Sequence, residues 1–216
     1  MTDLYPKPPH LMIAVWSADD EEWVFGRACD VAGEFGCVPT GVAEEWPAKK
    51  VWYRRKGLGT VIVERLFGTE SETHPVAISS SAGALGWPEE LWTAKDRKAA
   101  YKLAGWATDV LRDLSSRTAA VYGAIAVEET LPTPSALRAG ISIGSLPFLS
   151  AGLPTAVHDK FHAALGRTQT VDWPNGTFFP GWRPYTRGNA ATPDRAALTA
   201  ASTTLGNTLL RRNNEQ

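Results

Sequence analysis

The first apolar segments of the chain alternate with an amphipathic stretch. Residues 11–16 are a short apolar run, which predicts a buried strand. Between Val24 and Phe35 the apolar side chains recur every three or four residues, which predicts a helix. Ser17 and the acidic residues 19–22 supply a cap and negative charge at its start, and Gly36 marks its end. The pattern indicates one strand followed by one helix, and then a loop rich in proline and glycine.

The next segments predict three strands, a long helix and a further strand. Residues 51–55 and 59–67 are predicted to form two strands joined by a tight turn. The second segment is rich in β-branched residues, which favour strands. Residues 74–79 are a further strand. Thr93, with Asp96 three positions later, resembles a capping box before a clear apolar stripe at helical spacing. The alternating segment 119–127 completes the series as another strand.

The second half of the chain is less regular. Residues 130–154 are rich in Pro, Gly, Ser and Leu without clear periodicity, which predicts a long connection. Residues 155–165 predict a short helix, and Asn175-Gly176 is the signal of a tight hairpin turn. A last helix opens near Thr192, with leucines spaced to seat it on the body of the protein.

This order of elements predicts an α+β fold. We expect a mixed or antiparallel sheet with its helices packed mainly on one face. The topology we expect is a split βαβ arrangement related to the ferredoxin-like fold, with an aromatic hairpin and a helix added at the C-terminal end. We expect a single domain over residues 1–216, with the core sheet and two helices in 10–129 and an extension packed on it in 130–216.

Composition and charge limit the class of protein. The 216 residues are 44% hydrophobic, and 22 Lys and Arg balance 23 Asp and Glu, so no overall field recruits nucleic acid or an anionic membrane. The N-terminal residues lack signal-peptide features, and proline and glycine break the longest apolar stretches. Two cysteines, Cys29 and Cys37, fit no redox or zinc motif. We expect a cytoplasmic protein, bacterial in composition, without a membrane segment.

Nine tryptophans are the most informative feature of the composition, because Trp combines a large apolar area with an N–H that needs a partner. The loops place several aromatic and cationic side chains where a partner could bind. These candidate binding residues are Trp46, Trp87, Trp173, Phe178, Phe179, Trp182, Arg183 and Tyr185. The alternative is that the C-terminal aromatic residues cover the core as a lid, because an exposed aromatic patch invites association.

A pair of histidines is the candidate metal site. His158 and His162 lie one helical turn apart, the spacing by which a helix presents two ligands to zinc. Asp159 follows the first histidine, where the zincin motif has Glu. A third ligand would come from elsewhere, with His74 and the pair Glu128-Glu129 as candidates. The alternative is that both histidines are ordinary polar residues on the flank of the helix.

Two further charged groups are candidates for function. The cluster of Glu64, Glu70, Glu72 and His74 could support acid–base chemistry if burial separated the pKa values of two carboxylates, although surface acids are commoner. The predicted hairpin carries the only candidate nucleic-acid surface, which combines aromatic residues with Lys49, Lys50, Arg54, Arg55 and Lys56. Alternation along a strand divides these cations between two faces, and cations also protect exposed sheet edges. We therefore do not expect nucleic-acid binding.

The sequence carries no catalytic or cofactor fingerprint and leaves open whether the protein is an enzyme. We expect a binding protein that acts on a protein partner through its Trp-bearing loops and needs no cofactor. An inhibitor of the immunity or antitoxin type is one concrete form of this expectation. The alternative is a small zinc-dependent hydrolase that uses His158 and His162 with a carboxylate.

Overall fold

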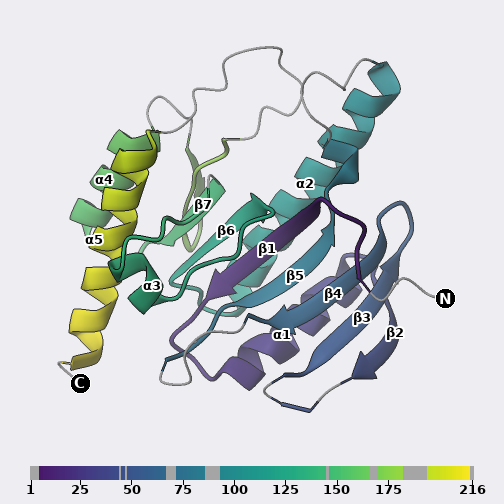
Figure 1. Cartoon of the computed structure of the whole chain (residues 1–216), viewed down its shortest axis with the longest axis horizontal. Coiled ribbons are helices and arrows are strands. Elements are labelled where there is room, and N and C mark those ends of the chain that lie inside the picture. Colours follow the sequence, from purple (N-terminus) through teal and green to yellow (C-terminus); the bar gives the residue numbers. More distant parts are fainter. Residues whose placement is uncertain are drawn as a thin grey trace.

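The computed structural model describes residues 5–43, 45–46, 48–66, 72–85, 93–144, 146–165, 170–181 and 194–214, with side chains to residue 211. Within these ranges the chain forms a nine-stranded antiparallel sheet and five α-helices (Figure 1). The strands are β1 (His10–Trp16), β2 (Val38–Ala43), β3 (Lys50–Arg55), β4 (Gly59–Arg65), β5 (Val76–Ser81), β6 (Tyr122–Val127), β7 (Leu146–Ser150), β8 (Val171–Trp173) and β9 (Gly176–Phe178). The α-helices are α1 (Glu21–Glu34), α2 (Ala94–Arg117), α3 (Pro134–Arg138), α4 (Thr155–Leu165) and α5 (Arg195–Asn214), and a 3₁₀ turn spans Gly83–Leu85.

The strand order β2-β3-β4-β5-β1-β6-β7-β9-β8 contains the expected split βαβ arrangement. Strands β1 and β4 flank β5, and each is antiparallel to it, so they run parallel to each other with α1 between them in sequence. Strands β5 and β6 flank β1 in the same way, with α2 in their connection. Two interlocked units of this kind form the ferredoxin-like core, and the α+β fold class is confirmed.

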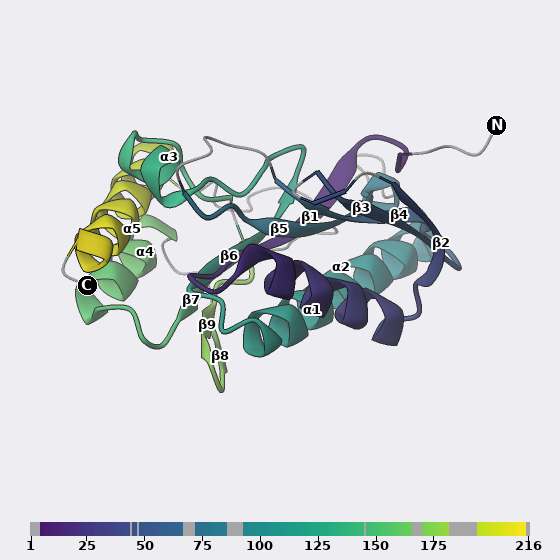
Figure 2. The ribbon, with the colours of Figure 1, turned by 90° about the horizontal axis from the view of Figure 1, so that it is seen from below.

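The first layer of helices packs on one face of the sheet, as expected. The side chains of Leu11, Ile13 and Val15 in β1 point to this face and join a buried cluster with α1 and α2. Figure 2 shows both helices lying side by side beneath the sheet. Alternation along the strand sends the neighbouring residues Ala14 and Trp16 to the opposite face.

The C-terminal helices α3, α4 and α5 pack on that opposite face, beside β6 and β7 (Figure 2). A second buried cluster joins Trp16 and Tyr122 of the sheet to these helices. Their rings stack with centroids 5.3 Å apart. The leucines expected to seat the last helix, Leu198, Leu205 and Leu209, are all buried there. This third layer covers the β6–β7 side of the sheet, whereas β3, β4 and β5 face the viewer of Figure 1 with no helix in front of them.

The helix ends follow from local hydrogen bonds. The N-cap of α1 is Asp20, whose side chain accepts from Trp23 N, whereas Ser17, the expected cap, bonds with Asp19. The expected capping box of α2 is present, because Thr93 and Asp96 bond each other's backbone N–H. Gly36 follows α1 with a φ of +82°, a conformation in which glycine avoids steric cost.

Two strands differ from the expectation that their segments are loops. Strand β2 pairs with β3 although all six of its residues are exposed, and its register shifts between Pro39 and Gly41. It has no buried face, so its sequence carries no alternating pattern. Strand β7 pairs with β6 and β9 inside the predicted connection 130–154. The sequence did not predict this strand because it contains Pro147, and proline is rare in paired strands.

Candidate functional site

The uncovered face of the sheet carries a row of aligned side chains. Cross-strand pairing places Lys50 of β3 opposite Glu64 of β4, and Glu64 opposite Ala77 of β5. Ala77 in turn lies opposite Ala14 of β1. Cross-strand partners project to the same face. A charged pair therefore lies beside small side chains, which leave room above the sheet.

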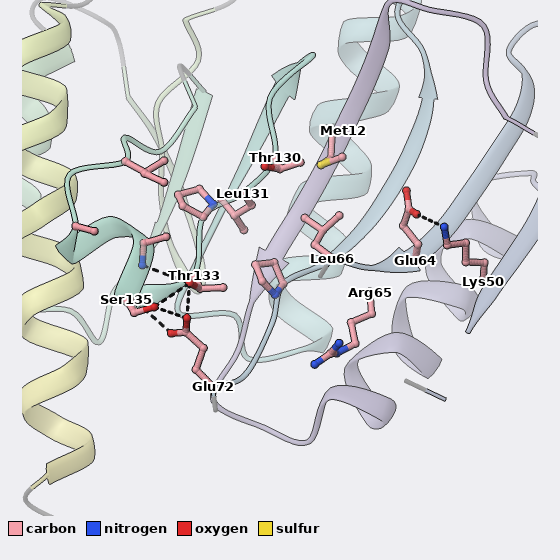
Figure 3. Close-up of a pocket in the computed structure, with 15 residues that line it drawn as sticks. Met12, Lys50, Glu64, Arg65, Leu66, Glu72, Thr130, Leu131, Thr133 and Ser135 are labelled. Carbon is pink, nitrogen blue, oxygen red and sulfur yellow. Dashed lines mark hydrogen bonds and ion pairs between the residues drawn. The ribbon is translucent and has the colours of Figure 1, made fainter. Parts of the chain in front are cut away.

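A cleft of about 600 Å³ opens between this face and the segment that follows β6 (Figure 3). Met12 of β1 and Leu66 after β4 line its sheet side, and Leu131 and Ile141 line the opposite wall. Ile141 is 56% exposed, so it lies on the rim. Most of the lining is apolar, and the charged side chains sit at its two ends. The charged and hydroxyl side chains that line it are Lys50, Glu64, Arg65, Glu72, Thr130, Thr133 and Ser135.

Lys50 and Glu64 form the polar end of the cleft on β3 and β4. Lys50 Nζ lies 3.4 Å from Glu64 Oε2, and Ser79 Oγ donates to the other carboxylate oxygen at 3.4 Å. Lys50 Nζ also donates to Tyr5 Oη at 3.0 Å. Burial lowers the pKa of Lys50, but the bond to Tyr5 and the charge of Glu64 outweigh it and leave the pKa raised. Lys50 therefore stays protonated and cannot serve as a general base near neutral pH.

Glu72 forms the polar end near α3. Its carboxylate accepts from Thr133 Oγ1 at 2.6 Å, from Ser135 N at 3.1 Å and from Ser135 Oγ. Thr133 is also the N-cap of α3. The same wall is tied to the sheet by Tyr122, whose hydroxyl donates to Pro132 O at 2.7 Å. These bonds fix the wall that faces the sheet, so the cleft is preformed.

Arg65 lies between this cleft and a second cavity of about 630 Å³. Its guanidinium bonds with Glu21 and with His74 Nδ1, and it lies over the ring of Trp46 at 5.9 Å. Arg65 and Glu72 line both cavities. His74 is buried, and its Nε2 lacks a hydrogen-bond partner among the described residues. This cluster ties the start of α1 to the ends of β4 and β5.

The charged side chains of the cleft are held by one another and by neighbouring groups. Lys50 pairs with Glu64, Arg65 with Glu21, and Glu72 with Thr133, so each of the four charged side chains that line the cleft has a partner. Within the described ranges, no three His, Cys, Asp or Glu side chains gather in a group that could hold a metal ion. A concave, largely apolar surface with a few fixed polar groups is typical of a binding site.

Three of the aromatic residues expected to contact a partner are buried. Trp173 stacks on Phe178 and on Phe148, with centroids 4.8 and 5.5 Å apart. Phe179 packs against Phe161 at 6.3 Å on the opposite face. Trp173 is 9% exposed, and Phe178 and Phe179 are each 1% exposed. These rings form a buried cluster near the C-terminal strands, as in the lid alternative, and are not accessible to a partner.

The other predicted binding residues divide into two groups. Trp46 is half-buried and packs edge-on against Phe25 of α1, with centroids 6.0 Å apart. It contacts the core and Arg65 rather than solvent alone. Trp87, Trp182, Arg183 and Tyr185 lie outside the described residues, so their expected role stays a prediction.

The histidine pair lies on α4 as expected, but its ring atoms have other contacts. His158 Nε2 lies 3.1 Å from Ser150 O, and the His162 ring meets Phe179 edge-on at 5.0 Å. The residues considered as a third zinc ligand contact other groups. His74 bonds with Glu21, and Glu128 pairs with His10 at 3.3 Å. Among the described residues the pair belongs to no group of three or more His, Cys, Asp or Glu side chains that could hold a metal ion, and the zinc-hydrolase alternative gains no support.

The charged clusters of the sequence are partly brought together. Glu64 and Glu72 line the same cleft at opposite ends, whereas Glu70 lies outside the described residues. Of the basic hairpin, Lys50 faces the cleft and Arg55 lies over the ring of Trp106 on the helical face. The apolar residues Met12, Leu131 and Ile141 were not singled out by sequence, because their segments meet only through the strand order.

None of the helices in the described part of the chain combines the length and the apolar character that crossing a bilayer requires. Protein-family models, curated proteins and solved structures were compared with the chain, and none of them matches it.

Proposed function

We propose that the protein works by binding a protein partner, and that the partner occupies the cleft between the uncovered sheet face and the wall formed by residues 130–141. The observation that carries this proposal is the preformed, mainly apolar cleft whose charged side chains are already paired. A protein partner buries an apolar surface surrounded by a polar rim whose groups are hydrogen-bonded, and the cleft has both features.

The location differs from the aromatic hairpin that the sequence suggested. Trp173, Phe178 and Phe179 are part of the core, whereas Ile141 and Met12 remain accessible beside the sheet. A protein that inhibits its partner by occupying it needs such a surface and no catalytic residues. An inhibitor of the immunity or antitoxin type remains the concrete form of the proposal that we favour, with a bacterial cytoplasm as its setting.

Site-specific photocrosslinking tests this proposal in the cells that produce the protein. Benzoylphenylalanine at Ile141, on the rim of the cleft, should crosslink a discrete protein. The control position is Trp23, which is 43% exposed on α1 and lies on the other side of the sheet. Equal adducts from both positions, or none from Ile141, would refute the cleft as the interface.

The captured partner then allows a quantitative test. Ile141→Asp places a charge at the apolar rim and should weaken binding at least about tenfold, because the partner would bury an unpaired carboxylate against apolar surface. Val171→Asp is the matched control, because Val171 is a 43% exposed apolar residue on β8 at the far edge of the sheet. Isothermal titration calorimetry should separate the two variants. Equal affinities for both variants would contradict the proposal.

A further inference from the structure

The first half of α2 carries a stripe of lysines. Lys95, Lys98 and Lys102 are separated by three and four residues, so they lie along one side of the helix, and all three are exposed. Figure 1 shows that the first turns of α2 extend past the end of the sheet. The stripe spans about 10 Å along the helix axis, from the rise of 1.5 Å per residue.

The cations in the two halves of α2 differ in whether they pair with acidic side chains. In the second half, Arg112 pairs with Asp109 and Arg117 pairs with Asp113, each at 2.9 Å. In the first half, no acidic side chain of the described chain pairs with the three lysines. Asp96, the acidic residue of the first turn, is held in the capping box with Thr93. Among the described residues, the three lysines therefore have no acidic partner.

This arrangement works against the stability of the helix. Like charges three or four residues apart repel each other on a helix surface, and cations near the N-terminus oppose the helix dipole. The second half of the same helix has the favourable arrangement, in which acidic residues pair with the arginines. Three unfavourable lysines in one stripe therefore indicate a role in binding an anion.

The basic hairpin extends the stripe. The guanidinium of Arg55 lies over the ring of Trp106 at 5.0 Å, and Trp106 is one helical turn beyond Lys102 on the same side of α2. Arg55 is fixed there because its Nε donates to Phe35 O at 2.8 Å. Lys56 follows it in the exposed turn between β3 and β4. We call Lys95, Lys98, Lys102, Arg55 and Lys56 the basic stripe.

We propose that the basic stripe binds the phosphate backbone of a nucleic acid. The spacing from Lys95 to Lys102 is close to three steps of one strand at about 3.4 Å each. The exposed residues between the lysines are Arg97, Ala99 and Tyr101, and Tyr101 is 55% exposed. One aromatic ring among cations can stack on a base, whereas a membrane-surface helix needs a continuous apolar face. The stripe lies with α2 on the helical face, whereas the cleft lies on the other face of the sheet. The two proposals are therefore independent.

The sequence did not predict this surface, since it divided the cations of the hairpin between two faces and did not connect them with α2. The fold brings Arg55 onto the helical face beside the lysines. The net charge of −1 means that binding cannot come from the overall charge of the protein. Any affinity for nucleic acid must therefore come from a local cluster of cations such as the basic stripe.

Fluorescence anisotropy tests the proposal with two labelled probes, a single strand of about twenty nucleotides and a duplex of about twenty base pairs. This length is on the order of one binding footprint. The full-length protein should bind with a micromolar dissociation constant at about 50 mM salt and weaken about a hundredfold at about 200 mM. The variant K95Q/K98Q/K102Q should bind at least about tenfold more weakly with a shallower salt dependence. Glutamine preserves helix propensity, and circular dichroism verifies the fold of each variant.

The matched control is R138Q/K160Q/R195Q, which removes three exposed cations from α3, α4 and α5 and changes the net charge equally. It should bind like the wild type. A fluorescent polyglutamate of equal charge is the competing probe. The proposal is overturned if the wild type binds neither oligonucleotide, or if both triple variants lose the same affinity. It is also overturned if the wild type binds polyglutamate as tightly as the oligonucleotides. The last result would instead assign the stripe to an acidic protein.

Discussion

Gly206 in α5 is the position where the packing of the third layer can be tested most sharply. A Cβ at this glycine would lie 2.5 Å from Arg138 N, 2.7 Å from Pro134 O and 2.9 Å from Leu137 Cβ. The first two are backbone atoms of α3, so neither can rotate away. Only the absence of a side chain lets α5 approach α3 this closely.

The magnitude follows from two opposing effects. Replacing a helical glycine by alanine stabilises an unobstructed helix by about 1 kcal/mol. Forcing a methyl group into packed backbone costs about 3 kcal/mol, at the upper end of overpacking in cores. Gly206→Ala should therefore lower the free energy of unfolding by about 2 kcal/mol. For a chain of this size that corresponds to a fall in Tm of about 4–8 °C.

Gly105→Ala is the control, because Gly105 is exposed in the middle of α2 and a Cβ there meets no atom within 4 Å. It should raise stability by about 1 kcal/mol. Urea denaturation followed by circular dichroism measures both changes. Stability of Gly206→Ala equal to or above that of the wild type would refute the close packing of α5 on α3. Equal changes in both variants would refute the reasoning as a whole.

Three further changes test the core and the helix caps. Trp173→Ala should lower the free energy of unfolding by about 3–5 kcal/mol in urea titrations, because the ring is stacked between Phe148 and Phe178; a surface residue would change it little. Thr93→Ala should cost about 1 kcal/mol in the same assay, and Thr93→Ser should retain the cap. Burial raises the pKa of Cys37 to about 11 from 9.0, so the unfolded chain ionises first and stability falls as the pH rises from about 9 to 11. Cys37→Ala should flatten that decline in pH-dependent unfolding.

The elements with a buried face were predictable from the sequence. The apolar run of β1, the stripe of α2 and its capping box at Thr93 are local signals, and each lies where it was expected. Alternation along β3 divides its residues between two faces, and the structure places Val51 and Tyr53 on the core face. The split βαβ order followed from the succession of these elements.

The candidate site was harder to predict, because it depends on contacts between distant segments. Glu72 bonds with Thr133, which is separated from it by 61 residues. Met12 and Ile141 meet across the cleft only because β1 is central in the sheet. Whether the aromatic rings of the hairpin are buried or exposed also depends on a distant segment. Composition shows that Trp173 is large and apolar, but its burial is decided by Phe148, a residue of the unpredicted strand β7.

The edge strand β2 has a consequence for the behaviour of the protein at high concentration. Among the described residues no strand pairs with its outer side, so the nine-stranded sheet has an edge to which another chain could add, the first step of cross-β aggregation. Pro39 has no N–H to offer, and the register shift before Gly41 interrupts a continuous ladder. At the opposite edge, β8 has three residues, too few to template a long strand. Both ends of the sheet are thus built to stop its growth, which protects the protein from fibre formation.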